Sequence, residues 1–375
     1  MGKAMVRVAV VVAVVLSLPL TAVAGPSDPQ MEYQGSFFIR PSGGQNFHYS
    51  NSLAFLPAEV GRTGQNTPTV VAHGGHSGSD DIREWFIPTL ATTPGGLGDG
   101  KTEVGGGGTT VLNTTYYLSG ATEFNGDLWL ERRDAQSKWS QTKVGPVVPG
   151  TVADWGNSVP AAMIKDFGDP VVPGGTDYTG YSLAPKRDEA NVLLETRFQH
   201  IVGGERIYVN RNTINPATDT FVPANVQNVF SFDLMTAEGL ASPAASLEYV
   251  TVGGTAYYVA SSEFNRAASV KLLFFDAATA TGGANVSPTF TIDVKSHIEG
   301  GAGWLNGAAG DSKIRDIALD PANNDLYLLD SDTGVTNFAY VHVFRISEPA
   351  ADPVPEPAGL GLLGLALLGI RKKRS

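Results

Sequence analysis

The feature that most constrains the fold of this chain is a repeated pattern of short strands, clearest near the C-terminus. Residues 314–320, IRDIALD, form a strand-like segment that leads into the turn residues 321–325, and a second and more apolar segment, residues 326–330, follows at once. A loop that contains Gly334 then leads to a third run, residues 340–346. Apolar runs rich in β-branched and aromatic residues, separated by Asn, Asp, Pro and Gly, are typical of strands joined by turns. The segment therefore predicts three antiparallel strands.

The same pattern recurs less clearly at four earlier places, which are residues 53–88, 114–133, 189–234 and 246–276. Divergent copies of about 40–60 residues favour radial repetition of small sheets. The unit is similar to a blade of the β-propeller family, which implies an all-β body of about five to seven blades. A strand at residues 35–40 is then expected to pair with the C-terminal strands and close the ring. A β-sandwich and two jelly rolls in tandem are the alternatives.

Composition agrees with an all-β body. Outside the two ends, no segment of fifteen residues has a sustained 3.6-residue apolar period, so long amphipathic helices are not expected. Residues 93–110 are rich in glycine and predict a long polar loop. The chain has no cysteine, which excludes disulfides, thiol nucleophiles and cysteine-based zinc sites.

The first 24 residues have the pattern of a secretory signal peptide. Two basic residues precede the apolar run of residues 8–18, which is too short to cross the ~30 Å hydrocarbon layer as a helix. Ala22 and Ala24 then supply the small residues that signal peptidase accepts, so we expect cleavage after Ala24.

The C-terminus carries three features in order. A proline-containing motif is followed by thirteen uncharged residues, 358–370, and then by four cations: the motif residues are Val354, Pro355, Glu356 and Pro357, and the cations are Arg371, Lys372, Lys373 and Arg374. A helix of thirteen residues spans only ~20 Å, so this tail predicts a short apolar transmembrane helix suited to a transient tether. The cations would hold its end at the cytoplasmic face.

This tail resembles the PEP-CTERM sorting signal of Gram-negative bacteria. The resemblance implies processing by an exosortase, a membrane cysteine protease, near the Pro-Glu-Pro motif. It also implies a link to exopolysaccharide or biofilm, and a cell-surface or extracellular destination after export through the inner membrane. The expected organisation is a signal peptide (1–24), an all-β body (25–347), a linker (348–353) and the sorting signal (354–375).

The net charge of the predicted body excludes some classes of binding partner. Residues 25–354 hold 20 Lys and Arg against 36 Asp and Glu, a net charge of −16. Such a body is not expected to bind nucleic acid, whose phosphates require cations. Residues 95–102 fit the P-loop pattern, but a proline precedes them and four glycines follow at residues 105–108, so the strand and helix that a nucleotide site needs are not predicted.

Two polar clusters predict metal binding. His73, His76, Asp80 and Asp81 lie within nine residues after a predicted strand, and imidazole with carboxylate suits zinc or another divalent ion. A plain polar loop is the alternative. The last repeat is rich in aspartates whose oxygens suit Ca²⁺, but the calcium-loop pattern D-x-[DN]-x-[DN]-G is missing, and turn chemistry is the alternative. These are Asp311, Asp316, Asp320, Asp325, Asp330 and Asp332.

Catalysis is left open by the sequence. Glycoside hydrolysis needs two acids across a cleft, and the sequence cannot place two candidates on one face. The candidates are Asp154, Asp166, Asp188, Glu189, Glu195 and Glu263. A G-x-S-x-G nucleophile motif is absent from the sequence. The first hypothesis is a non-enzymatic surface protein that binds a glycan or protein, and the alternative is a secreted metal-dependent hydrolase or lyase acting on polysaccharide.

Overall fold

The computed structural model divides the chain into two compact units, Met1–Pro29 with Glu348–Ser375, and Gln30–Ser347. The described residues are 28–39, 52–57, 68–74, 81–87, 90, 103–107, 117–133, 139–144, 165–166, 179–202, 204–217, 220–221, 227–235, 246–262, 271–294, 312–332 and 339–348. Regular structure in these ranges is entirely β, which confirms the predicted fold class. The described part of the chain holds no helix with the length and apolarity needed to cross a bilayer. The predicted signal peptide and C-terminal helix lie outside these residues.

The second unit contains five sheets, mostly of consecutive antiparallel strands. The first two are β2 (Ser52–Leu56), β3 (Thr69–Gly74), β4 (Asp81–Phe86) and β5 (Glu103–Gly107), then β6 (Tyr117–Phe124), β7 (Asp127–Arg133), β8 (Trp139–Val144) and β9 (Lys165–Asp166). The third has six strands, β10 (Thr179–Pro185), β11 (Val192–Ile201), β12 (Gly204–Asn215), β13 (Thr220–Phe221), β14 (Gln227–Met235) and β18 (Ala284–Asn285). The last two are β15 (Leu247–Val252), β16 (Thr255–Ser262), β17 (Lys271–Asp276) and β19 (Phe290–Asp293), then β20 (Ser312–Asp320), β21 (Asp325–Asp332), β22 (Ala339–Ser347) and β1 (Gln30–Ile39).

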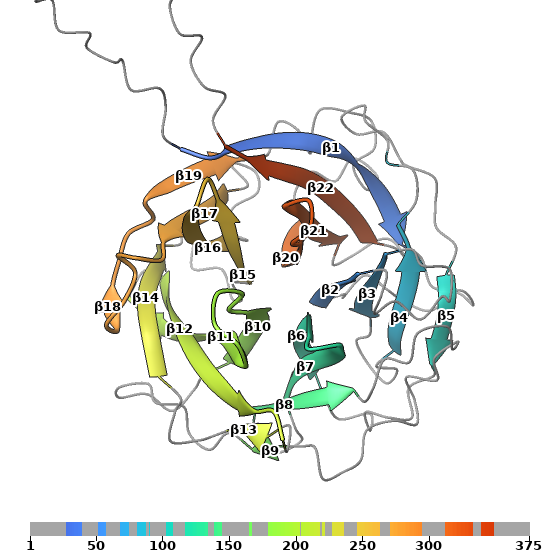
Figure 1. The fold of residues 1–375 in the computed structure, drawn as a ribbon, viewed down its shortest axis with the longest axis horizontal. Coiled ribbons are helices and arrows are strands. Elements are labelled where there is room, and N and C mark those ends of the chain that lie inside the picture. The colour runs from blue at the N-terminus through green and yellow to red at the C-terminus, as the bar shows by residue number, and fades with distance from the viewer. Residues whose placement is uncertain are drawn as a thin grey trace, which may run out of the picture. The chain divides into compact units, whose positions relative to one another are not determined.

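The sheets are arranged around a ring, as Figure 1 shows. The first strands of the five sheets, β2, β6, β10, β15 and β20, contact one another in sequence around the centre. This is the radial arrangement of a β-propeller. Four sheets have the four strands of a regular blade, and the third is larger. The propeller-like arrangement is confirmed, but with four regular blades the count is slightly lower than the predicted five to seven.

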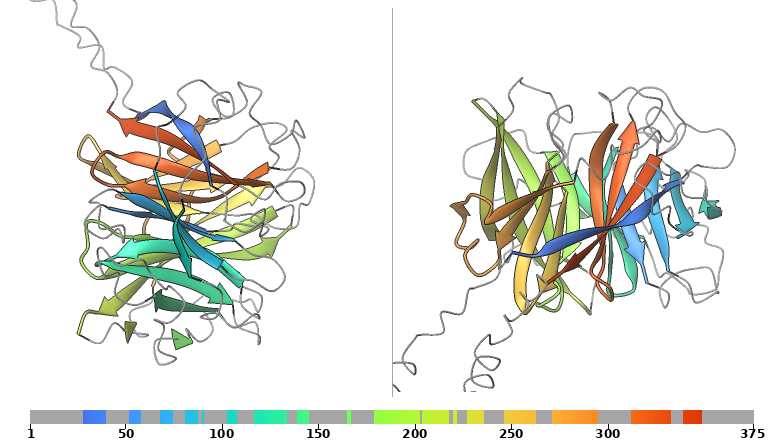
Figure 2. Two further views of the ribbon diagram at one scale, coloured as in Figure 1. Left: turned by 90° about the vertical axis from the view of Figure 1, so that its right-hand side faces the viewer. Right: turned by 90° about the horizontal axis from the view of Figure 1, so that it is seen from above.

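The ring is closed by strands from opposite ends of the unit. β1 pairs antiparallel with β22 from Gln30–Ser347 to Ile39–Ala339, which places the blue strand beside the red one in Figures 1 and 2. This confirms the predicted closure. A chain of buried hydrogen bonds crosses the pairing: His342 Nε2 lies 3.1 Å from Asp330 Oδ2, and His342 Nδ1 lies 3.0 Å from Ser36 Oγ.

The core lies between neighbouring sheets. Phe275 packs in one apolar cluster with Phe230 and Phe232, whereas the adjacent Phe274 packs on the other side of its sheet. Consecutive residues of a strand point to opposite faces. The last three sheets are covered on both faces, so their strands contain apolar pairs such as Leu328–Leu329, and this pattern made the last repeat visible in the sequence.

One predicted loop is wrong in part. Residues 93–110 were expected to be a loop, but Glu103–Gly107 forms β5 and pairs with β4 at the edge of its sheet. Backbone pairing to a strand edge needs no side chain, so a tertiary edge overrides the low strand propensity of glycine.

Candidate functional site

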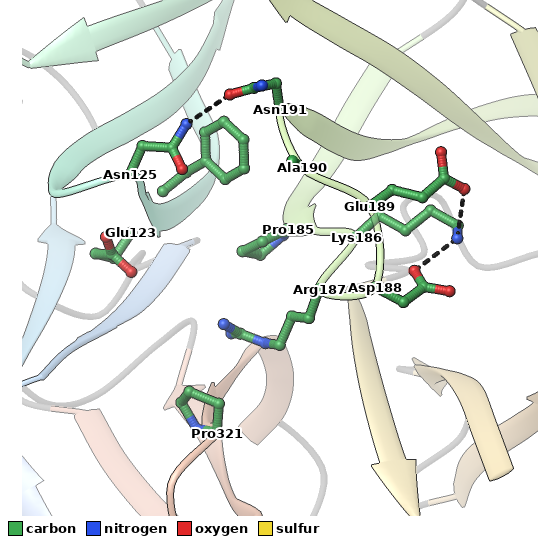
Figure 3. A pocket seen from close by; sticks show the side chains of 11 residues that line it. Glu123, Asn125, Pro185, Lys186, Arg187, Asp188, Glu189, Ala190, Asn191 and Pro321 are labelled. Carbon is green, nitrogen blue, oxygen red and sulfur yellow. Dashed lines mark hydrogen bonds and ion pairs between the residues drawn. The ribbon is translucent and has the colours of Figure 1, made fainter. Parts of the chain in front are cut away.

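The described pocket of most functional interest lies on one side of the ring, where the first strand of each sheet turns into the second. It has a volume of about 480 Å³. Its lining comes from the β6–β7 turn, the loop of residues 186–191 between β10 and β11, and Pro321 at the β20–β21 turn (Figure 3). A neighbouring hollow of about 520 Å³ lies on the other side of the same loop, toward the β15–β16 turn. Both volumes are in the range of small-molecule sites.

Local sequence shapes each wall of the pocket. Asn125 and Gly126 have positive φ angles of 55° and 83°, as a two-residue hairpin turn requires. The Glu123 carboxylate accepts a 2.7 Å hydrogen bond from the Gly126 amide, and Asn125 donates to the Asn191 side chain across the pocket at 3.3 Å. The rim is therefore held by hydrogen bonds before any ligand arrives.

The loop between β10 and β11 carries four consecutive charged residues with different orientations. Lys186 lies 2.7 Å from both Asp188 and Glu189, and Figure 3 shows these three side chains grouped together. Tyr249 donates a 2.6 Å hydrogen bond to Asp188. Although burial works against the charged form, the hydrogen bonds from Lys186 and Tyr249 leave the pKa of Asp188 below its ordinary value. Arg187 instead points into the pocket between Pro185 and Pro321 (Figure 3).

Two buried carboxyl groups lie on the central strands. Glu248 of β15 accepts a 3.1 Å hydrogen bond from the Leu319 amide, and its other oxygen lies 3.8 Å from the Arg187 guanidinium. Asp316 of β20 accepts hydrogen bonds from the Leu53 amide at 2.8 Å and from Ser182 Oγ at 3.3 Å.

Burial decides the protonation of both groups. It raises the pKa of Glu248 to about 7, against the opposing influence of Arg187. Burial likewise raises the pKa of Asp316 well above its ordinary value, and the charge of Glu248 adds to that shift. A carboxyl group with a pKa near neutrality can accept or release a proton under physiological conditions.

The predicted imidazole site is only partly covered by the structure. His73 is in β3, where its backbone pairs with Ser52 and Ile82, and Asp81 begins β4. The side chains of both, and the whole of His76 and Asp80, lie outside the described residues, so this metal site stays a prediction. Among the described side chains, no group of three or more His, Cys, Asp or Glu is close enough to share a metal ion.

The aspartates of the last repeat have separate roles where they are described. Asp320 accepts hydrogen bonds from the Ala322 amide and from Asn323 at 2.9 and 2.8 Å, as a turn-capping residue does. Asp325 pairs with Arg345 at 2.8 Å, and Asp330 contacts His342. Asp311 and the side chain of Asp332 lie outside the described residues. Asp320 therefore follows the turn-chemistry alternative, whereas Asp325 and Asp330 are engaged by an arginine and a histidine, and Asp316 accepts a backbone amide from another sheet.

The described acids among those considered for glycoside hydrolysis are held by cations. Glu195 is buried and paired with Arg197 at 3.0 Å, and Asp188 and Glu189 are held by Lys186. Asp154, Glu263 and the side chain of Asp166 are outside the described residues. Sequence reasoning missed Arg187 and Glu248. The available signal was the run of residues 186–189, one of two stretches of four charged residues within the body.

One segment of the chain, at its C-terminus, matches a known protein family. Residues 353–374 match the PEP-CTERM protein-sorting motif. No curated protein sequence matches the chain significantly. The motif implies that the protein is exported and is sorted to the cell surface by an exosortase.

Similar solved structures have identities near one in ten. A tail fibre of Staphylococcus aureus phage P68 has 11% identity and a TM-score of 0.41, and covers 92% of this chain and 56% of its own, so this chain spans little more than half of it. A mutant of AofleA from Arthrobotrys oligospora has 10% identity and a TM-score of 0.41 (88% and 91% covered). A GH62 hydrolase in complex with xylotriose has 10% identity and a TM-score of 0.45 (84% and 97% covered).

Proposed function

We propose that this exosortase-sorted protein is a non-enzymatic glycan-binding β-propeller of the cell surface or extracellular matrix. The observation that carries the proposal is the pocket at the centre of one side of the ring. Turns from three sheets meet there, and their polar groups are already ordered by hydrogen bonds. A preorganised polar pocket suits a ligand rich in hydroxyl groups, because few side chains lose conformational entropy when the ligand binds.

The described surface favours a glycan over a protein as the ligand. Among the described residues, the exposed large hydrophobic side chain is Val202, which stands alone. Protein interfaces rely on clustered aromatic or aliphatic anchors. A link to exopolysaccharide or biofilm is the corresponding biological role, and exosortase and signal peptidase are the processing partners.

One observation favours a hydrolase as the second candidate. Glu248 has the raised pKa of a general acid and lies 3.8 Å from Arg187, which lines the pocket. However, its side chain is only 3% exposed, so a substrate would have to displace Arg187 to reach it. Release of reducing sugar from a polysaccharide by the wild-type protein, lost in Glu248→Gln, would favour this candidate.

The test of glycan binding uses the exported protein recovered from its host. A glycan array is probed with the wild type, with Ala190→Trp and with Ala217→Trp. Ala190 lines the pocket, so its replacement fills the cavity, whereas the exposed Ala217 lies at the β12–β13 turn and serves as a matched control. We expect binding by the wild type and the control and loss in Ala190→Trp. Equal binding by all three proteins, or by none, would refute the proposal.

A further inference from the structure

Arg187 is the cation that the described part of the pocket presents to a ligand. Its side chain is 26% exposed. Figure 3 shows that it points between Pro185 and Pro321. The other nearby cations are occupied elsewhere. Lys186 contacts Asp188 and Glu189, and Arg211 also binds Glu189.

The contact between Arg187 and Glu248 is loose. The guanidinium lies 3.8 Å from the carboxylate, beyond the 2.7–2.9 Å of a strong charge-assisted hydrogen bond. Elsewhere in the same fold, Arg206 binds Asp233 through two hydrogen bonds of 2.7 and 3.0 Å. The planar fork of Arg187 is therefore not saturated by Glu248, and it can form the paired hydrogen bonds that a ligand carboxylate accepts.

Glu248 is an internal competitor for this guanidinium. The groups that face it are Arg187 from the β10–β11 loop, the Leu319 amide and the carboxyl of Asp316 from β20, and the Tyr249 amide on its own strand. Arg187 is the cation among them. When Glu248 is charged, it holds Arg187 electrostatically; when it is protonated, that attraction ends.

We propose that Arg187 binds the carboxylate of a uronate-containing saccharide, and that protonation of Glu248 releases the guanidinium to that ligand. This inference rests on the proposed glycan-binding function and adds the class of glycan. Around Arg187, the side chains of Glu123, Asn125 and Asn191 offer carboxylate and amide groups to sugar hydroxyls. The aromatic side chain in the described lining, Phe124, is only 6% exposed, so these residues offer no aromatic anchor to an acidic peptide.

The test compares two ligands of which one has charged carboxylates and the other has neutral methyl esters in their place. Trigalacturonate and its methyl ester are titrated calorimetrically into the exported protein at pH 6 and pH 8. At pH 6 we expect the acid to bind about 10- to 100-fold more tightly than the ester, as loss of hydrogen bonds to a charged group predicts. Arg187→Ala should abolish this preference and Arg187→Lys should keep part of it. If Arg187→Ala does not fold, Arg187→Gln replaces it.

The pH dependence tests Glu248 separately. Between pH 6 and pH 8 the affinity of the wild type for trigalacturonate should fall by up to about tenfold, because binding favours the protonated carboxyl. In Glu248→Gln the affinity should stay constant. An unchanged pH dependence in this variant would overturn the role of Glu248.

Other outcomes separate the two proposals. Binding of neutral glycans on the array, with equal affinity for trigalacturonate and its ester, would overturn the uronate inference and leave glycan binding intact. A hexaglutamate peptide that binds as tightly as trigalacturonate would overturn the choice of a saccharide. No binding on the array and none in the titration would refute both.

Discussion

Replacing Glu248 by glutamine is expected to stabilise the protein at pH 8 and to have little effect at pH 4. The carboxyl is buried, and its pKa rises from 4.5 to about 7 on folding. Between these values the folded chain keeps a proton that the unfolded chain has lost. Stability from this group is therefore complete below pH 4.5 and is lost as the pH rises through 7.

The size of the effect follows from the two pKa values. Their difference corresponds to about 3 kcal/mol of unfolding free energy at pH 8. A glutamine oxygen can still accept from the Leu319 amide, whereas the 3.8 Å ion pair with Arg187 is lost. We therefore expect a net gain of about 2–3 kcal/mol at pH 8.

Urea unfolding of the exported protein from pH 4 to pH 8 measures this difference. Glu32→Gln is the matched control, because Glu32 is exposed on β1. The wild type and the control should lose stability as the pH rises toward 8, and Glu248→Gln should lose less. Parallel curves for all three proteins would show that burial of Glu248 does not govern this dependence.

Three further predictions concern other parts of the chain. In Gly120→Ala the new Cβ would lie 2.7 Å from the Ser182 Cα, so β6 and β10 must separate, and we expect a loss of about 1–3 kcal/mol in urea unfolding; an unchanged midpoint would contradict this close approach. His342→Ala should lower stability by about 2–4 kcal/mol through its buried hydrogen bonds, and a preserved melting temperature would argue against a closing role. Replacing Pro355, Glu356 and Pro357 by alanine should leave an uncut, membrane-held precursor, and an unchanged mature mass would refute the sorting role.

The sequence predicted strands whose residues form runs rich in apolar, β-branched and aromatic side chains. The last repeat is visible because Leu328 and Leu329 serve cores on opposite sides of one sheet. β10 was missed because its residues, TGYSLAP, lack a β-branched run. Here small residues allow the central strands to approach one another, as Gly120 and Ser182 do. In a sequence, small residues such as Gly and Ser usually indicate a turn. Their role in close strand contacts becomes apparent only when the ring is formed.

The pocket could not be predicted because its walls come from distant segments. Asn125, Arg187 and Pro321 belong to three repeats, and each is an ordinary turn or loop residue within its own repeat. They meet because every first strand of a sheet ends on the same side of the ring. To predict that these three residues lie in one pocket, one would have to know the number of sheets and the register of each. The charged residues 186–189 were visible, but the opposite orientations of Arg187 and its neighbours depend on the contacts of Lys186.

The buried acids connect the stability of the ring to its pocket. The central strands contact one another, and among the described residues no strand pairing joins the central strand of one sheet to that of the next. Asp316 and Glu248 supply such links, because they accept backbone amides from β2 and β20 across the gaps between sheets. The Glu248 link costs stability as the pH rises from 4.5 to about 7. A ligand anion that takes Arg187 from Glu248 raises the pKa of this carboxyl further, so binding of the anion should be accompanied by uptake of a proton. The proton count on binding, measured by calorimetry in two buffers of different ionisation enthalpy, should approach one near pH 8 and vanish in Glu248→Gln.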